Sequence, residues 1–301
     1  MDAVFDAQFR LMKDEFSRRG IRIEVALRPD GEADYLYQEG HLLALSTDEN
    51  LGVLTNVLPG LRGTQQHDLR PDGALTTFTN DELQNGELSV PEALELIDRQ
   101  RRNRNLELAP EGVAAVSPDH VVHIARICPA VEPEVPSGNP VSPWPAPRAD
   151  CKSDREILIG VSDTGLLGKL DLARYTWLKD VTGDPDPLGP VTRSGLPRIP
   201  AYTGHGTFVA GIAKSEAPQA RVLVNDHFSV SGGELESVIV GKIEELVRAG
   251  ADVINLSAGT YTRNNWSSLG FDSFNRRHPE IAFVADMSGE WSSAGTREIT
   301  R

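Results

Sequence analysis

One histidine in the chain stands where an imidazole ring can do proton chemistry. His205 lies between Gly204 and Gly206, and the small and apolar residues 207–213 follow directly. This pattern predicts a helix that begins at the histidine and is buried along most of its length, with the glycines leaving space for the ring and for a neighbouring backbone. A histidine at a helix start beside a cleft is a candidate general base. A structural histidine has the same local pattern, so the surrounding elements must decide between the two.

The elements around His205 alternate between strand and helix. Four apolar runs have the length of buried strands, namely residues 157–162, 221–225, 252–257 and 281–285. Apolar residues at helical spacing predict a helix over residues 234–249, which Gly250 ends. Alternation of this kind predicts a doubly wound α/β fold with a mostly parallel sheet. Ligands of such sheets bind beyond the carboxyl ends of the strands, where Asp163 and Ser257 lie.

Three segments resemble, in the required order, the motifs of the subtilisin-like serine proteases (subtilases, peptidase family S8). Residues 157–165, ILIGVSDTG, are similar to the aspartate motif of that family, and residues 205–212, HGTFVAGI, resemble its histidine motif. Residues 253–259, VINLSAG, are similar to its substrate-binding strand. The resemblance implies a subtilisin-like peptidase domain over residues 153–301, incomplete at its C-terminus.

The resemblance also assigns roles to single residues. It implies that Asp163 is the carboxylate that orients the imidazole ring and that His205 is the general base of an Asp–His–Ser triad. It implies that Ser257, Ala258 and Gly259 pair with the backbone of an extended polypeptide substrate or peptide ligand. Without the resemblance, Asp163 could equally be a turn residue and Ser257 the end of a core strand.

The nucleophile motif of the family, Gly-Thr-Ser-x-Ala-x-Pro, does not occur in the sequence. The last proline is Pro279, and Gly295-Thr296 is followed by Arg297 where the motif has serine. After the fourth apolar run, Glu290 stands near the place of the family's oxyanion-binding asparagine and would repel a developing negative charge. We therefore expect a serine endopeptidase family member that is inactive as given. It would be either a truncation or frameshift product or a genuine pseudoprotease that binds extended peptides.

A reading from another enzyme class rests on the same aspartate. Asp163-Thr164-Gly165 also matches the Asp-Thr-Gly of aspartic proteases. That mechanism needs two carboxylates that share a proton. It also needs a β-rich fold, which the helices predicted at His205 and over residues 234–249 contradict.

Residues 1–126 are predicted to form a smaller α+β domain. The expected elements are a helix ending near Gly20, a strand over 21–27, a hairpin of 35–37 with 42–45, a short helix over 48–58, a loop over 62–86 and a helix over 91–102. Residues 112–125 predict two short strands around Ser117-Pro118-Asp119 and are similar to the end of a subtilase inhibitory propeptide. Both a propeptide-like inhibitor or chaperone and an unrelated accessory domain remain open.

A proline-rich segment, residues 127–152, predicts a stiff, extended linker between the two domains. Cys128 and Cys151 lie within it near its two ends. Two free thiols in a reducing compartment are the favoured interpretation, and a disulfide between them remains the alternative.

The composition limits the partners and the location. The formal net charge of −14 argues against nucleic acid and anionic membranes as partners. Charges such as Asp6 and Lys13 interrupt any apolar core of a signal peptide, so we expect a cytoplasmic protein without a membrane span. No cofactor is expected. Asp184 and Asp186 in the insert 183–200 are candidate calcium ligands, with solvated loop residues as the favoured alternative.

Overall fold

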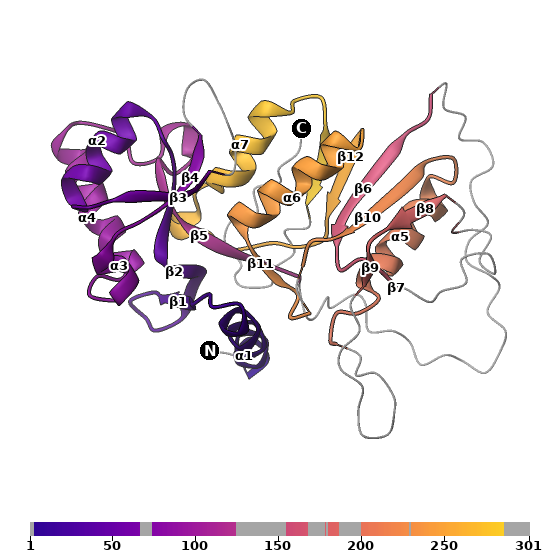
Figure 1. Cartoon of the computed structure of the whole chain (residues 1–301), viewed down its shortest axis with the longest axis horizontal. Coiled ribbons are helices and arrows are strands. Elements are labelled where there is room, and N and C mark those ends of the chain that lie inside the picture. Colours follow the sequence, from indigo (N-terminus) through magenta and orange to yellow (C-terminus); the bar gives the residue numbers. More distant parts are fainter. Residues whose placement is uncertain are drawn as a thin grey trace. The chain divides into compact units, whose positions relative to one another are not determined.

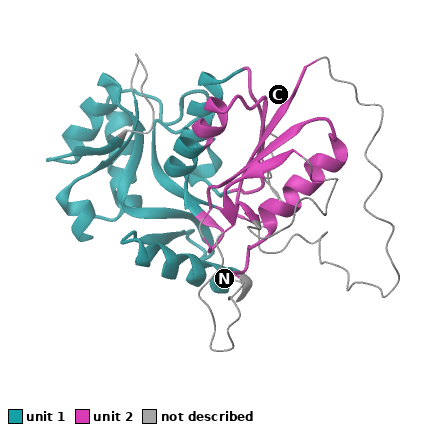
Figure 2. Cartoon of the chain, turned by 45° about the vertical axis from the view of Figure 1, so that its right-hand side comes forward, with its two compact units in different colours: residues 1–122, 234–242, 260–279 teal, residues 123–233, 243–259, 280–301 magenta. Residues whose placement is uncertain are grey.

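The computed structural model describes residues 3–66, 74–124, 155–167, 178, 180–186, 200–228 and 230–285. The chain forms two compact units, which Figure 2 colours separately. Unit 1 comprises residues 1–122, 234–242 and 260–279, and unit 2 comprises residues 123–233, 243–259 and 280–301. The predicted linker and both cysteines fall in residues 125–154, outside the described residues, so the predicted domain boundaries stay a prediction.

Unit 2 is built on a five-stranded parallel sheet. Its strands are β6 (Leu158–Asp163), β8 (Val181–Gly183), β10 (Arg221–Asp226), β12 (Val253–Leu256) and β13 (Ala282–Ala285). Their order is β13-β12-β6-β10-β8, and each neighbouring pair is parallel. The four predicted strands are therefore confirmed, and β8 is added at one edge. In Figure 1 these strands lie side by side with β6 in the middle.

Helices cover both faces of the sheet of unit 2, as a doubly wound fold requires. On one face, Val161 of β6 and Val222 of β10 pack against Ala210 of helix α5 (His205–Glu216). On the other face, Gly160 has no side chain, and Leu246 of helix α6 (Glu236–Arg248) fills the space above it. The α/β class predicted from the sequence is therefore correct.

Helix α5 begins at His205 as predicted, but it is less buried than predicted. Its buried residues are Gly206, Ala210, Gly211 and Lys214. Phe208 and Ile212 are 47% and 40% exposed. The reason is geometric: one face of the helix lies on the sheet, and these two side chains, four positions apart, share the opposite face. Two short strands, β7 (Leu166–Leu167) and β9 (Pro185–Asp186), pair in parallel beside the helix start.

Unit 1 contains a six-stranded sheet. Its strands are β1 (Ile23–Leu27), β2 (Ala33–Leu45), β3 (Arg62–Gln66), β4 (Leu75–Thr79), β5 (Val116–His123) and β11 (Gly233–Leu235). The order is β11-β5-β2-β4-β3, and β1 also pairs with β2. The pairs that join β1, β3, β4 and β5 into this sheet are antiparallel.

Helices pack on both faces of this sheet as well. Helices α2 (Asp48–Val57) and α4 (Val90–Asn103) bury Leu54 and Leu94 in a core with Leu42 and Phe78 of the sheet. Helix α1 (Ala3–Arg18) packs Met12 and Phe16 against Leu36 and Val121. The described residues of unit 1 also include helices α3 (Asp81–Asn85) and α7 (Leu269–Arg277) and the 3₁₀ turns η1 (Pro110–Gly112) and η4 (Arg263–Asn265). Unit 1 thus has the α+β character expected of the N-terminal residues.

Three local predictions for the N-terminal region were wrong. Residues 33–45 form one long strand instead of a hairpin. Gly40, with φ of +82°, lies at an irregularity of register within this strand and not in a turn between two strands. Of the predicted loop 62–86, the described residues 62–66 and 74–86 contain β3, β4 and α3. Residues 116–123 form one continuous strand, in which Pro118 pairs with Leu42 instead of ending it.

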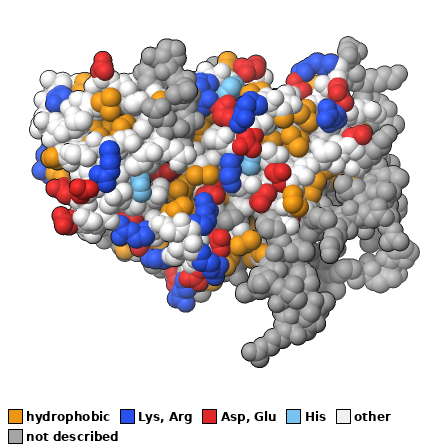
Figure 3. Space-filling model, in the orientation of Figure 1, with side chains coloured by type: hydrophobic (Ala, Val, Ile, Leu, Met, Phe, Trp, Pro, Cys, Tyr) orange, Lys and Arg blue, Asp and Glu red, His pale blue; other side chains and the backbone are white. Residues whose placement is uncertain are grey.

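On the face drawn in Figure 3, acidic and basic side chains are interspersed over the described elements. Among the described residues, no helix combines the length and the apolar character that a membrane crossing needs.

Candidate active site

The candidate acid, Asp163, is held at the carboxyl end of the central strand of unit 2. Strand β6 pairs along its length with β10, and Asp163 pairs with Asp226 in that register. Its side chain is fully buried, and Oδ1 accepts a hydrogen bond of 2.8 Å from the backbone N–H of Thr164. The sheet thus fixes the backbone of this residue, and the following turn fixes its carboxylate.

The candidate base, His205, is the first residue of helix α5. The residue before it, Gly204, has φ of +93°, a left-handed conformation that glycine adopts without strain. The residue after it, Gly206, lies so close to the turn after β6 that a Cβ atom there would be 2.5 Å from the carbonyl oxygen of Gly165. Both flanking glycines are therefore required by the backbone geometry that brings the helix start to the strand end.

These two elements bring the carboxylate and the imidazole into direct contact. Nδ1 of His205 lies 2.8 Å from Oδ1 and 2.9 Å from Oδ2 of Asp163. Because a carboxylate only accepts, Nδ1 carries the donated proton, and Nε2 is the basic nitrogen of the neutral ring. The side chain of Asp163 is 1% exposed and that of His205 is 31% exposed. The arrangement is an accessible base oriented by a buried acid.

A second carboxylate, Asp186, joins this site and lies elsewhere than the sequence predicts. Asp186 is only 5% exposed, so it is not the solvated loop residue that was favoured. Its Oδ2 accepts hydrogen bonds from the N–H of Gly204 at 2.6 Å and from the hydroxyl of Thr164 at 3.0 Å. Burial raises the pKa of Asp186, and these two donors counteract that rise. An acidic residue in a proline- and glycine-rich insert gave no signal of this role.

A buried serine–histidine pair, also missed by the sequence analysis, lies next to Asp163. Oγ of Ser162 is 2.8 Å from Nδ1 of His227, and both residues are almost fully buried. The N–H of His227 donates to the carbonyl oxygen of Asp163 at 2.8 Å. Because neither side chain is accessible, this pair supports the strand end and has no route to a peptide substrate.

The predicted substrate strand already pairs with another segment of unit 2. The N–H of Gly259 donates to the carbonyl of His123 at 3.1 Å, and the N–H of His123 donates back at 2.9 Å. The N–H of Ile124 donates to the carbonyl of Gly232 at 2.8 Å. This is the antiparallel main-chain pairing that an extended peptide would make. Of the other two predicted residues, Ala258 is buried, and Ser257 accepts a hydrogen bond from Asn255 at 2.8 Å.

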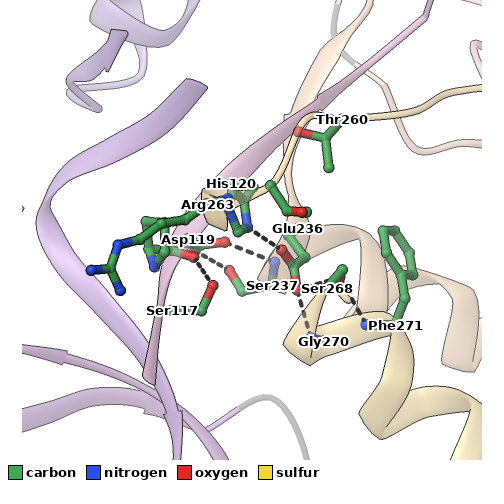
Figure 4. A network of polar contacts seen from close by, with 12 residues as sticks. Ser117, Asp119, His120, Glu236, Ser237, Thr260, Arg263, Ser268, Gly270 and Phe271 are labelled. Atoms are coloured by element: carbon green, nitrogen blue, oxygen red, sulfur yellow. Dashed lines mark hydrogen bonds and ion pairs between the residues drawn. The ribbon is translucent and has the colours of Figure 1, made fainter. Parts of the chain in front are cut away.

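Unit 1 contains a second carboxylate–imidazole pair, shown in Figure 4. Nδ1 of His120 lies 2.8 Å from Oε2 of Glu236, and both side chains are at most 2% exposed. Oε1 of Glu236 accepts from the hydroxyl of Ser268 at 2.6 Å and from the N–H of Gly270 at 2.5 Å, at the start of α7. Nε2 of His120 accepts from the N–H of Arg263 at 3.3 Å. Every polar atom of this pair thus has a structural role.

A neighbouring carboxylate in unit 1 caps helix α6. Asp119 is fully buried, and its two oxygens accept from the N–H of Ser237 at 3.0 Å and from the hydroxyl of Ser237 at 2.5 Å. Figure 4 shows Asp119 beside His120 on strand β5. Burial raises the pKa of the Asp119 carboxyl to about 7, and the two bonds from Ser237 oppose that rise.

Several residues considered in the sequence analysis lie outside the described residues, among them Glu290 and the segment 295–297. Within the described ranges, no group of three or more histidine, cysteine, aspartate or glutamate residues has an arrangement that could hold a metal ion.

Asp184, the other candidate calcium ligand, accepts a hydrogen bond from the N–H of Asp226 at 3.2 Å.

Comparison with known proteins finds one family model and two similar proteins among its matches. Residues 154–296 match the family model Peptidase_S8, described as the subtilase family. The minor extracellular protease Vpr of Bacillus subtilis (strain 168) is 36% identical over 125 residues, which cover 37% of this chain and 15% of Vpr. Fervidolysin from Fervidobacterium pennivorans, described as a keratinolytic enzyme related to subtilisin, aligns with a TM-score of 0.46 and 18% identity, over 87% of this chain and 40% of fervidolysin.

The chain therefore spans less than half of each of these relatives. The three predicted motifs all lie inside the matched residues 154–296. Residues 154–296 are therefore similar to the subtilase family of subtilisin-like serine proteases.

Proposed function

We propose that this chain supplies the acid and the base of a subtilisin-type serine endopeptidase. The observation that supports the proposal is the pair of Asp163 and His205, with Nδ1 of the ring 2.8 Å from the carboxylate. The acid is buried, whereas 31% of the histidine side chain is exposed. A base that is oriented by a buried acid and accessible to substrate is what acyl transfer requires.

Each residue has a defined part in the proposed reaction. Nε2 of His205 accepts the proton of a serine hydroxyl while the serine oxygen forms a bond to the carbon of the peptide carbonyl. The π electrons move to the carbonyl oxygen, and the imidazolium ring stays paired with the carboxylate of Asp163. When the C–N bond breaks, the ring returns the proton to the leaving amine.

Residues 1–301 do not supply the serine of this mechanism in the motif that the family uses. Residues 1–301 contain no Gly-Thr-Ser-x-Ala-x-Pro motif. We therefore propose that the 301-residue chain forms no acyl-enzyme, because loss of the nucleophile removes the covalent route.

Labelling with a fluorophosphonate probe tests this proposal. The 301-residue chain should not label, whereas the product of the coding DNA read past Arg301, in the frame that encodes the serine motif, should label. In that longer product, Asp163→Asn should lower the labelling rate by about 10⁴-fold, because the ring loses its orienting charge and tautomer. Labelling of the 301-residue chain, or an unchanged rate in the Asp163→Asn variant, would contradict it.

A second candidate function is the binding of extended peptides without cleavage. It is supported by the main-chain pairing of His123 and Ile124 with Gly259 and Gly232, which shows that these strand edges accept an extended segment. The same pairing supports the propeptide-like interpretation of residues 1–126, because the end of that region covers the edge that a peptide would use.

Competition with a synthetic peptide of residues 119–124 tests this second function. Excess peptide should perturb the amide resonances of Gly259 and Gly232 in the NMR spectrum. A control peptide that is N-methylated at the positions of His123 and Ile124 lacks both donors and should have no effect. The His123→Pro variant removes one internal donor and should bind the peptide more tightly. Absence of binding to both proteins by calorimetry would exclude peptide holding.

A further inference from the structure

Three turns of unit 2 converge at the start of helix α5. They are residues 163–165 at the end of β6, residues 184–186, which include β9, and residues 204–206 at the start of the helix. A Cβ atom on Gly165 would lie 2.9 Å from the N atom of Asp186, and one on Gly206 would lie 2.5 Å from the carbonyl oxygen of Gly165. The backbones are therefore in direct contact, so the position of β9 bears on the geometry of both other turns.

The side chain of Asp186 links the other two turns by hydrogen bonds. Its Oδ2 accepts from the N–H of Gly204 and from the hydroxyl of Thr164. The same Thr164 hydroxyl oxygen accepts from the N–H of Gly206 at 3.3 Å. Asp186 thus reaches the residue before His205 directly and the residue after it through Thr164.

Helix α5 depends on this carboxylate because its own first residues do not supply a cap. Gly204 is the N-cap and makes no side-chain capping bond. A carboxylate on the N–H groups at a helix start satisfies donors that lack partners within the helix and interacts favourably with the helix dipole. Here Asp186, more than fifteen positions earlier in the sequence, accepts from the N–H of the N-cap residue, the donor that the N3 glutamate of a capping box satisfies in other helices.

We propose that Asp186 is a positioning residue for His205, and that through Gly204 and Thr164 it fixes the helix start so that Nδ1 points at Asp163. This proposal rests on the proposed function, since it concerns the same base. The position of the His205 ring matters because a displacement of about 1 Å lowers the rate of proton transfer by about 10²-fold. Burial raises the pKa of Asp186 and the Gly204 and Thr164 donors lower it, as expected for a carboxylate held in this linking role.

The experiment uses the 301-residue chain and observes the ring of His205 directly, so it needs no catalytic serine. Nitrogen-15 NMR of the ring reports which nitrogen carries the proton, and the solvent exchange rate of the Nδ1 proton reports how well the contact with Asp163 is held. In Asp186→Ala the exchange rate should rise about tenfold, equivalent to one lost hydrogen bond. In Asp186→Asn the amide oxygen can still accept both hydrogen bonds. The ring nitrogen shifts and the Nδ1 proton exchange rate of His205 should therefore stay as in the wild type.

Asp184→Ala is the matched control, because Asp184 lies two residues before Asp186. Its carboxylate accepts from the N–H of Asp226 and not from Gly204 or Thr164 in the described hydrogen bonds. It should leave the His205 signals unchanged. If Asp186→Ala does not fold, Thr164→Val tests the same linkage, since it removes the bridging hydroxyl and keeps the branched shape. Thr164→Val should also raise the solvent exchange rate of the Nδ1 proton of His205.

The outcomes separate a positioning role from a purely structural one. If Asp186→Ala lowers the melting temperature but leaves the ring shifts and the proton exchange of His205 unchanged, the proposal is wrong. If Asp163→Asn also leaves the His205 ring signals unchanged, the acid–base pair itself is wrong and the proposed function fails separately.

Discussion

Two carboxylate–imidazole pairs among the described residues have the same contact but different surroundings. Glu236 with His120 in unit 1 and Asp163 with His205 in unit 2 both place Nδ1 2.8 Å from a carboxylate oxygen. His120 is 2% exposed, whereas the side chain of His205 is 31% exposed. Accessibility of the ring, not the pair itself, distinguishes a candidate base from a structural histidine.

The two acids also differ in how many groups depend on them. Glu236 accepts from His120, from the hydroxyl of Ser268 and from the N–H of Gly270, and so joins β5 to the start of α7. Asp163 accepts from His205 and from the N–H of Thr164 next to it. We therefore expect removal of Glu236 to affect stability first, and removal of Asp163 to affect the histidine ring first.

The largest effect is expected for Glu236→Ala. The change leaves the buried His120 and Gly270 and the half-buried Ser268 without their acceptor, so the free energy of unfolding should fall by roughly 3–5 kcal/mol. Urea denaturation followed by circular dichroism measures this loss. Asp163→Ala is the matched comparison and should lose clearly less. Equal losses in the two variants would remove the distinction between the pairs.

The next effect concerns Asp119, whose pKa burial raises to about 7 from an ordinary value of 3.8. Between these two values the folded protein holds a proton that the unfolded chain releases. The contribution of Asp119 to stability is therefore fully present below pH 4 and is lost as the pH rises through 7, by at most roughly 4 kcal/mol. Asp119→Asn removes this titration, so its stability should fall less than that of wild type between pH 4 and 8.

The control for this pH dependence is Asp81→Asn, because the side chain of Asp81 is 83% exposed. Urea denaturation across the same pH range should give parallel curves for Asp81→Asn and wild type. A curve for Asp119→Asn that is also parallel to wild type would show that the buried carboxyl titrates normally.

The smallest effect is expected at an exposed pair. Nζ of Lys13 lies 2.7 Å from Glu24, but the two side chains are 45% and 41% exposed. Such a pair contributes about 0.2–1 kcal/mol and is weakened further by salt. In 0.5 M salt, Glu24→Gln should therefore change the unfolding free energy by less than one third of the loss in Glu236→Ala. A larger change would mean that a short contact distance matters more than burial.

The contact of Asp163 with His205 could be expected from the sequence, because both residues lie in local motifs. The end of β6 and the start of α5 are set by an apolar run and by glycines, and these features are visible at Asp163 and His205. Asp186 could not be predicted, because its burial depends on β9 pairing with β7, and strands of two residues leave no periodic pattern. His227 was missed for a similar reason: its partner, Ser162, is adjacent only after β6 and β10 pair.

The same distinction holds for the fold. The helices and parallel strands of unit 2 follow from continuous apolar runs, whose burial on both faces leaves a clear signal. Residues 62–86 looked like a loop because β3 carries polar residues such as Gln65, while β4 lies in the interior with threonines such as Thr77. Pro118 suggested a break between two strands, but it lies within β5 and pairs with Leu42 of β2. Tertiary pairing overrides local preference in each of these cases.

The position of β6 has a consequence for how the protein is made. Both neighbours of this strand, β10 and β12, are later in the chain, so a ribosome releases residues 158–163 well before 221–226 and 253–256. Strand β6 can pair only after β10 and β12 have been synthesised. Pairing over such a long sequence separation closes a long loop and is slow. During synthesis this strand therefore depends on protection from premature association, and its hydrogen-exchange protection should appear late in refolding.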